Sequence, residues 1–251
     1  MPVLGRRSVL IAGAGLLAAR PALAESNGPS NGPWAIELFT SQGCSSCPPA
    51  DRLLTKLAAR RDGSLAPLSF HVDYWDYIGW KDRFASKATT ERQRAYARTL
   101  KQRYVYTPEM VVDGRVHQPG INDGQIDAML ADARRQSPAR TTPQLVRAPD
   151  GALTIRLAAA KLESGPADVT VFAYDLQHST PVGRGENEGR RLDNFNVVRR
   201  FEIVGQWNGA EAHWTVPADR FESGQGLAVI VQQPDHGLVL GCAKIETGLA
   251  G

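Results

Sequence analysis

Two cysteines, Cys44 and Cys47, are separated by two serines in the stretch FTSQGCSSCPPAD, which covers residues 39–51. Cysteines at this spacing can close a disulfide with little backbone movement. As thiolates they can also supply two ligands to a metal ion, or act as nucleophiles in thiol–disulfide exchange. The pair therefore offers three kinds of site: a redox centre, part of a metal site, or a structural disulfide.

The residues around the pair indicate a junction between a strand and a helix. Residues 34–39 are apolar apart from Glu37, which is typical of a buried strand. After Cys47, apolar residues recur at spacings of three, four and seven, which predicts an amphipathic helix that begins at two prolines. The dipole of this helix would lower the pKa of the Cys44 thiol. Cys47, one turn further on, would then attack a mixed disulfide on Cys44.

Helical and strand-like patterns continue to residue 137. Residues 65–75 predict a second strand, and the polar, basic residues 81–104 predict a second helix. A strand, an Asp113-Gly114 turn and a partner strand follow, and residues 121–136 predict a third helix. The expected order of elements is therefore β-α-β-α-β-β-α.

Thr107 and Pro108 open the strand before this turn, at a position where a central strand does not accept proline. A cis-proline there would place an exposed backbone edge beside the cysteines, where a substrate peptide can bind. Trp75 belongs to the aromatic stretch VDYWDYIGW. This stretch either packs at the edge of the core or forms a rim that receives apolar client segments.

The element order, the C-x-x-C pair and Thr107-Pro108 resemble the thioredoxin fold. The chain beyond residue 24 also resembles a family of secreted, thioredoxin-like bacterial proteins catalogued as domain of unknown function 1223. The matching stretches are ELFTSQGCSSCPPAD, FHVDYWDYIGWKDRFAS, RQRAY, VYTPEMVVDG and RGENEGRRLDNFNVVR. The thioredoxin resemblance implies that Cys44 attacks, Cys47 resolves, Pro108 is cis, and Glu37 shuttles a proton. Thioredoxins have Gly-Pro in place of Ser45-Ser46, so the direction of electron flow stays open.

The second half of the chain has a different character. Short strand-like runs separated by turn residues fill residues 143–247, which predicts an antiparallel β-sandwich. The expected fold class is therefore an α/β thioredoxin-like domain, residues 34–137, followed by an all-β domain. A charged loop, GRGENEGRRLDNFNVVRR, precedes one of these strands, and either internal ion pairs or a partner-binding surface would explain it.

Residues 1–24 carry paired arginines, a short apolar run and an Ala-Leu-Ala end, which indicate a signal peptide for twin-arginine export. Residues 25–33 are typical of a linker. Removing the three arginines of residues 1–24 from the 29 basic residues leaves 26 against 26 acidic ones. This balance gives no reason to expect nucleic-acid binding. We expect a periplasmic or secreted protein with no membrane span after cleavage.

The leading hypothesis is thiol–disulfide exchange on protein or small thiol substrates, without an organic cofactor or a resident metal. The residues expected to carry it are Cys44, Cys47 and Glu37 in catalysis, with Thr107, Pro108 and Trp75 in substrate binding. One alternative is a copper-binding protein in which His71 joins the two thiolates. Others are a partner-binding envelope protein and a structural disulfide. Cys242, in an apolar run, is expected to be a small buried hydrophobe.

Overall fold

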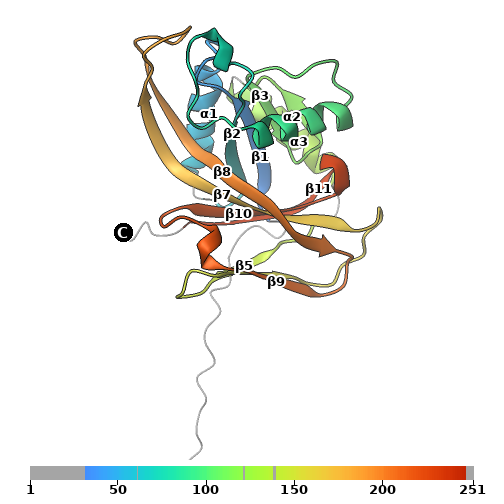
Figure 1. Cartoon of the computed structure of the whole chain (residues 1–251). Helices are drawn as coiled ribbons and strands as arrows, with labels where there is room; N and C mark the ends of the chain where they lie inside the picture. Colours follow the sequence, from blue (N-terminus) through green and yellow to red (C-terminus); the bar gives the residue numbers. More distant parts are fainter. Residues whose placement is uncertain (1–31, 61, 121, 138–139, 247–251) are drawn as a thin grey trace, which may run out of the picture.

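A computed structural model of the chain describes residues 32–60, 62–120, 122–137 and 140–246 (Figure 1). Within these residues one mixed sheet has the strand order β11-β10-β7-β8-β2-β1-β3-β4, and a second sheet has the order β5-β6-β9. The strands of the large sheet are β1 (Trp34–Thr40), β2 (Leu65–His71), β3 (Glu109–Val112), β4 (Val116–Gln118), β7 (Ala167–Pro181), β8 (Arg191–Trp207), β10 (Gly226–Gln232) and β11 (Val239–Ile245). Those of the small sheet are β5 (Gln144–Arg147), β6 (Leu153–Leu157) and β9 (Ala212–Val216).

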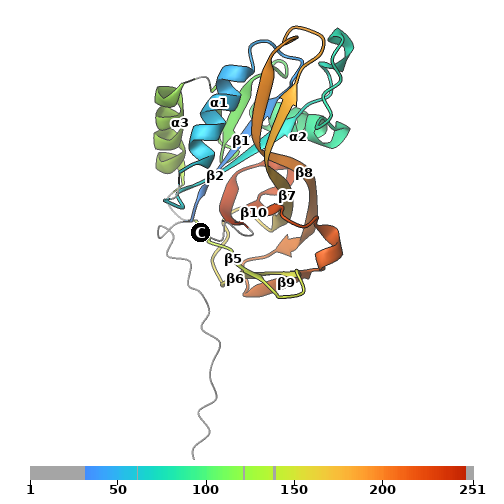
Figure 2. The same ribbon diagram turned by 90° about the vertical axis from the view of Figure 1, so that its left-hand side faces the viewer.

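Helices cover both faces of β1 and β2 (Figure 2). The helices α1 (Pro48–Ala58) and α3 (Asp123–Gln136) lie on one face, and α2 (Lys87–Thr99) lies on the other. Side chains alternate along β1 accordingly: Ile36 and Leu38 join the core with α1 and α3, whereas Phe39 joins the core with α2. The expected order of elements in this half is confirmed.

The expected fold class is wrong. Instead of an α/β domain followed by a separate all-β sandwich, the described residues form a mostly β structure with three α-helices and a large mixed sheet. The strand β8 from the second half pairs in parallel with β2 from the first half, with Ser69 opposite Val197. This pairing makes one sheet of strands from both halves. Among the described residues, only the small sheet, packed on β7 and β10, has the character of a sandwich.

The long hairpin of β7 and β8 reaches from the small sheet up to α1 (Figure 1). Its two strands pair antiparallel from Ala167 and Trp207 to Pro181 and Arg191. Residues 182–190, called the hairpin tip below, connect them at the end nearest the cysteines. The expected signal peptide, residues 1–24, lies outside the described residues, as does nearly all of the expected linker, 25–33.

Candidate functional site

A disulfide joins Cys44 and Cys47 at the start of α1, and their Cα atoms are 5.5 Å apart. Cys47 is the N-terminal cap residue of α1, and two prolines occupy the first helical positions. Both cysteines are buried, with 1% and 0% of their surface exposed, whereas Ser45 and Ser46 between them are exposed. The strand–cysteine–helix junction expected from the sequence is therefore present, but its sulfur atoms lie beneath the surface.

Four of the expected site residues lie together around Cys44. Its Sγ atom is 3.9 Å from the carbonyl oxygen of Thr107, and the peptide bond between Thr107 and Pro108 is cis. The indole Nε1–H of Trp75 donates to Thr107 Oγ1 at 2.7 Å. The Ser46 hydroxyl lies 3.3 Å from Cys44 Sγ, where it can donate to the sulfur once that sulfur is a thiolate.

The hairpin tip covers the cysteine loop. Asn187, which is buried, donates from Nδ2 to the carbonyl oxygens of Gln42 and Cys44, both at 2.9 Å. The backbone N–H of Ser45 donates to the Glu186 carboxylate at 3.1 Å. Hydrogen bonds from Ser45, through its side chain first and its backbone second, lower the pKa of Glu186. The charged loop singled out in the sequence therefore binds the cysteine loop directly, in addition to any role at the surface.

Asp51 lies one helical turn after Cys47 and is buried. Its backbone N–H donates to the Cys47 carbonyl at 3.1 Å, and its carboxyl accepts from the Thr40 hydroxyl at 2.9 Å. Burial raises the pKa of Asp51 from 3.8 to about 7, although His71 and Thr40 oppose the rise. A carboxyl with this pKa can hold or release a proton near neutral pH, one helical turn from Cys47.

His71 and Asp82 form a second buried pair behind the same loop. The His71 Nδ1 atom is 2.6 Å from an Asp82 carboxylate oxygen, which also accepts from the backbone N–H of Gln42 at 2.8 Å. Burial opposes the charge on both groups, but their mutual attraction lowers the pKa of Asp82 and raises that of His71. Within the described chain the buried His71 Nε2 atom has no hydrogen-bond partner.

Glu37 lies elsewhere, in a buried ion pair with Arg92 of α2. Arg92 donates to both carboxylate oxygens at 2.5 and 2.8 Å, and the Tyr96 hydroxyl donates at 2.5 Å. Although burial disfavours its charge, the Glu37 carboxylate raises the pKa of Arg92. The described side-chain contacts of Glu37 are therefore with α2 and not with the cysteines.

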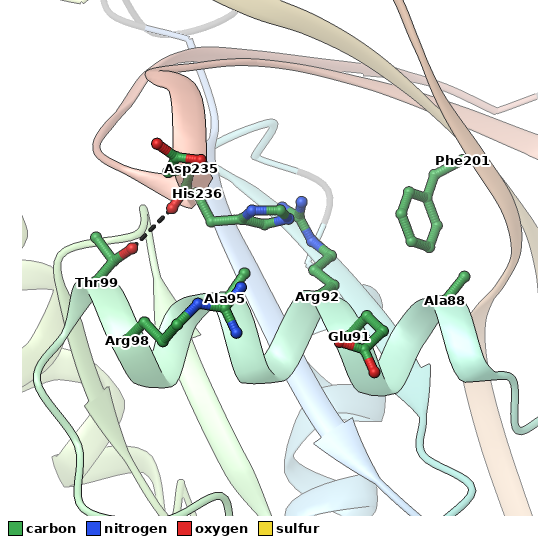
Figure 3. A pocket seen from close by; sticks show the side chains of 9 residues that line it. All are labelled: Ala88, Glu91, Arg92, Ala95, Arg98, Thr99, Phe201, Asp235 and His236. Carbon is green, nitrogen blue, oxygen red and sulfur yellow. Dashed lines mark hydrogen bonds between the residues drawn. The ribbon is translucent and has the colours of Figure 1, made fainter.

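Arg92 also lines a cavity of about 540 Å³ between α2 and the turn before β11 (Figure 3). Figure 3 shows its side chain rising from α2 beside the His236 ring. Burial, helped by Arg92 and Arg98, lowers the pKa of His236 to about 3, so this imidazole is neutral. The cavity is thus a separate place from the cysteine loop. Its lining is Ala88, Glu91, Arg92, Ala95, Arg98, Thr99, Phe201, Asp235 and His236.

The third cysteine and the metal alternative can be placed as well. Cys242 is free and fully buried, as expected, and burial raises the pKa of its thiol to about 12. Among the described residues no group of three or more His, Cys, Asp or Glu side chains is arranged to hold a metal ion. His71, the histidine considered for copper, is instead paired with Asp82.

None of the helices in the described part of the chain has the length and apolar character to cross a membrane.

Sequence reasoning missed Asp51 as a buried acid, Asp82 as the partner of His71, and Asn187 as a clamp on the cysteine loop. The signal for Asp51 was present, because residues four apart on a helix share a face and Asp51 follows Cys47 by four. Asp82 and Asn187 had no such signal. They reach the loop only through the tertiary fold.

A family model described as "Protein of unknown function (DUF1223)" matches residues 35–232. No curated protein sequence matches the chain significantly. The crystal structure of a protein from Agrobacterium tumefaciens is similar, with 32% identity and a TM-score of 0.74 over 87% of this chain and 96% of that one. HBP35 of Porphyromonas gingivalis has 16% identity and a TM-score of 0.55 over 87% and 76%, a likeness of fold alone.

Proposed function

This chain belongs to the DUF1223 family, and we propose that it carries out thiol–disulfide exchange through Cys44 and Cys47. The observation that carries the proposal is the arrangement around the disulfide. The pair lies at the start of α1, where the helix dipole favours a thiolate, and the buried Asp51 carboxyl lies one turn behind Cys47. A purely structural bridge gains little from closing so short a loop.

In the oxidising direction, a substrate thiolate attacks Cys44 Sγ and breaks its bond to Cys47. The products are a mixed disulfide on Cys44 and a thiolate on Cys47. A second substrate thiolate then attacks the substrate sulfur of the mixed disulfide and releases Cys44. Two substrate thiols are thus oxidised to one disulfide, and the protein disulfide is reduced to two thiols. Run backwards, the same steps reduce a substrate disulfide.

Asp51 supports this chemistry as a proton donor and acceptor for Cys47. Cys47 is fully buried, so its thiolate would be costly without a nearby proton source. A carboxyl with a pKa of about 7 can give its proton to that thiolate and take it back in the reverse step. Ser46 supports Cys44 instead, because its hydroxyl can donate to the Cys44 sulfur.

We assign the reaction to the periplasm or the extracellular space. The signal-like residues 1–24 favour export, and disulfides persist in such oxidising compartments. A fusion of residues 1–33 to a reporter that is active only after export tests this assignment. Replacing Arg6 and Arg7 by lysine should block export of the fusion protein if the twin-arginine route is used.

The exchange reaction is tested by trapping. In C47S the mixed disulfide on Cys44 cannot be resolved by Cys47, so partners from cell envelopes should accumulate as covalent adducts. C44S is the matched control, and C242A excludes adducts on the third cysteine. Purified wild type should also catalyse exchange with insulin or a small disulfide. An absence of both adducts and exchange would refute the proposal.

The burial of both sulfur atoms favours a second candidate, a structural disulfide. The two candidate functions predict different effects of reducing the disulfide on stability and on reaction rate. A structural disulfide predicts that the reduced protein loses several degrees in Tm and reacts slowly with dithiothreitol. A redox pair predicts rapid, reversible reduction with a folded reduced form.

A further inference from the structure

A groove of about 570 Å³ borders the cysteine loop. One wall is formed by Ser45 and the first turns of α1, and the other by the last residue of the hairpin tip and the first residues of β8. Ser45 follows Cys44 directly, so a molecule in this groove lies against the cysteine loop, although neither cysteine lines the groove. The lining residues are Ser45, Pro48, Pro49, Arg52, Arg190, Arg191 and Leu192.

All the ionisable residues that line the groove are arginines. Arg52 comes from α1, whereas Arg190 and Arg191 come from the far half of the sequence. Within the described part of the chain none of the three forms an ion pair, and Arg190 is held by a hydrogen bond to Asn187 Oδ1 at 3.0 Å. Beyond residue 24 the chain has equal numbers of acidic and basic residues, so this cluster does not follow from its overall charge.

Charge and size together indicate the ligand. Guanidinium groups bind carboxylates through paired hydrogen bonds. The volume lies within the range of about 300–1,000 Å³ that is usual for small-molecule sites. Both cysteines are buried and the hairpin tip is bonded over them, so a small disulfide meets less obstruction than a protein one.

We propose that this groove binds low-molecular-weight disulfides and thiols that carry carboxylates, and guides them to Cys44. The proposal rests on the exchange function above. In the reduced protein, the Cys44 thiolate attacks the bound disulfide RSSR, forms a Cys44–SR bond and expels one RS⁻. The Cys47 thiolate then attacks Cys44 Sγ and expels the second RS⁻. The two protein thiols are oxidised to a disulfide, and their electrons and protons convert RSSR into two RSH.

Three symmetrical disulfides of similar size provide the test: dithiodipropionate with two carboxylates, neutral bis(2-hydroxyethyl) disulfide, and cationic cystamine. Reduced full-length protein is mixed with each, and the loss of free thiols is followed. At low salt the anionic disulfide should react on the order of tenfold faster than the neutral one, and cystamine more slowly. The differences between the three rates should become smaller as salt screens the charges.

The ratio of the anionic to the neutral rate is then measured in R52Q/R191Q and should fall towards one. The matched control R135Q/R156Q removes two arginines from α3 and β6 and should keep the wild-type ratio. Equal rates for the three disulfides in wild type would overturn the groove's role but leave exchange intact. A charge preference seen only with a disulfide inside an acidic peptide would overturn the small-molecule assignment. If none of the disulfides reacts, the exchange function fails and the groove proposal fails with it.

Discussion

Two clusters of buried charge lie between the central strands and the helices that cover them, and they differ in how many of their polar atoms have hydrogen-bond partners. In the first, Glu37 is bound at both carboxylate oxygens by Arg92. In the second, behind the cysteine loop, Asp51 has a pKa raised to about 7 and His71 keeps one buried ring nitrogen without a partner in the described chain. The first cluster is a bidentate ion pair, whereas the second contains a carboxyl whose pKa lies near neutral pH.

The comparison shows that burial alone does not mark an acidic residue as a proton-transfer group. Glu37 occupies the strand position that the thioredoxin resemblance assigned to a proton shuttle, yet its described partners tie it to α2. Asp51 is on a helix, one turn after Cys47, and its backbone N–H donates to the Cys47 carbonyl. We therefore assign structure to the Glu37–Arg92 cluster and proton transfer to the Asp51 cluster. The following predictions separate the two clusters.

The largest effect is expected at Arg92. R92L leaves the Glu37 carboxylate buried without its cation and should lower the free energy of unfolding by about 3–5 kcal/mol. Urea denaturation measures this change. R94L, two residues further along α2, breaks only the exposed pair with Glu91 and should cost less than about 1 kcal/mol. A loss of exchange activity in R92L at full stability would contradict the structural assignment.

The second effect is a pH dependence that arises from Asp51. Its pKa is about 7 in the folded protein, against the ordinary aspartate value of 3.8 in the unfolded chain. Between these values the folded protein holds a proton that the unfolded chain has lost, so stability is full below the lower pKa and falls as pH rises towards the higher one. D51N should abolish this decline, worth about 2 kcal/mol or more between pH 4 and pH 7.

Thermal melts of the oxidised protein across this range measure the slope. The pKa of His71 is raised, so its contribution to stability is lost only as pH rises above the ordinary histidine value of 6.5. The pH ranges in which Asp51 and His71 act therefore differ. Exchange by D51N should also lose the inflection near pH 7. Identical pH profiles of stability and exchange rate in D51N and wild type would contradict a role of Asp51 in proton transfer.

A smaller effect is expected from loosening the hairpin tip. N187A leaves the buried carbonyl groups of Gln42 and Cys44 without their donor, which should cost about 1–3 kcal/mol. Reduction of the disulfide by dithiothreitol should become several-fold faster, because the loop is freer to open. E188Q changes an exposed neighbour and serves as the control. Unchanged reduction in a destabilised N187A would show that the tip does not limit access.

The smallest effect concerns Ser46. S46A removes the hydroxyl 3.3 Å from Cys44 Sγ and should raise the pKa of the Cys44 thiol by about one unit. The rate of alkylation of the reduced protein as a function of pH measures this pKa. In S45A this pKa should stay at the wild-type value, because the hydrogen bonds of Ser45 go to Glu186 in the hairpin tip. Equal shifts in the two variants would contradict a specific role for Ser46.

Local features of this molecule were predictable from the sequence, and pairings over long distances were not. The junction at Cys44 and Cys47 follows from apolar periodicity, and the place of Thr107-Pro108 follows from the rarity of proline in strands. No local pattern in the sequence predicts that β2 pairs with β8. Ser69 and Val197 are far apart in the sequence, and a strand pattern does not specify its neighbour in the sheet. The fold class was wrong for that reason.

The most direct test of the central claim is the reduction potential of the Cys44–Cys47 disulfide. An exchange centre predicts a value between about −270 and −120 mV, the range of known dithiol catalysts. Equilibration of the purified C242A protein with glutathione or dithiothreitol buffers gives this value. A potential within that range, with a reduced form that stays folded, is the predicted result. A potential below about −300 mV, as in structural disulfides of secreted proteins, would contradict the proposed function.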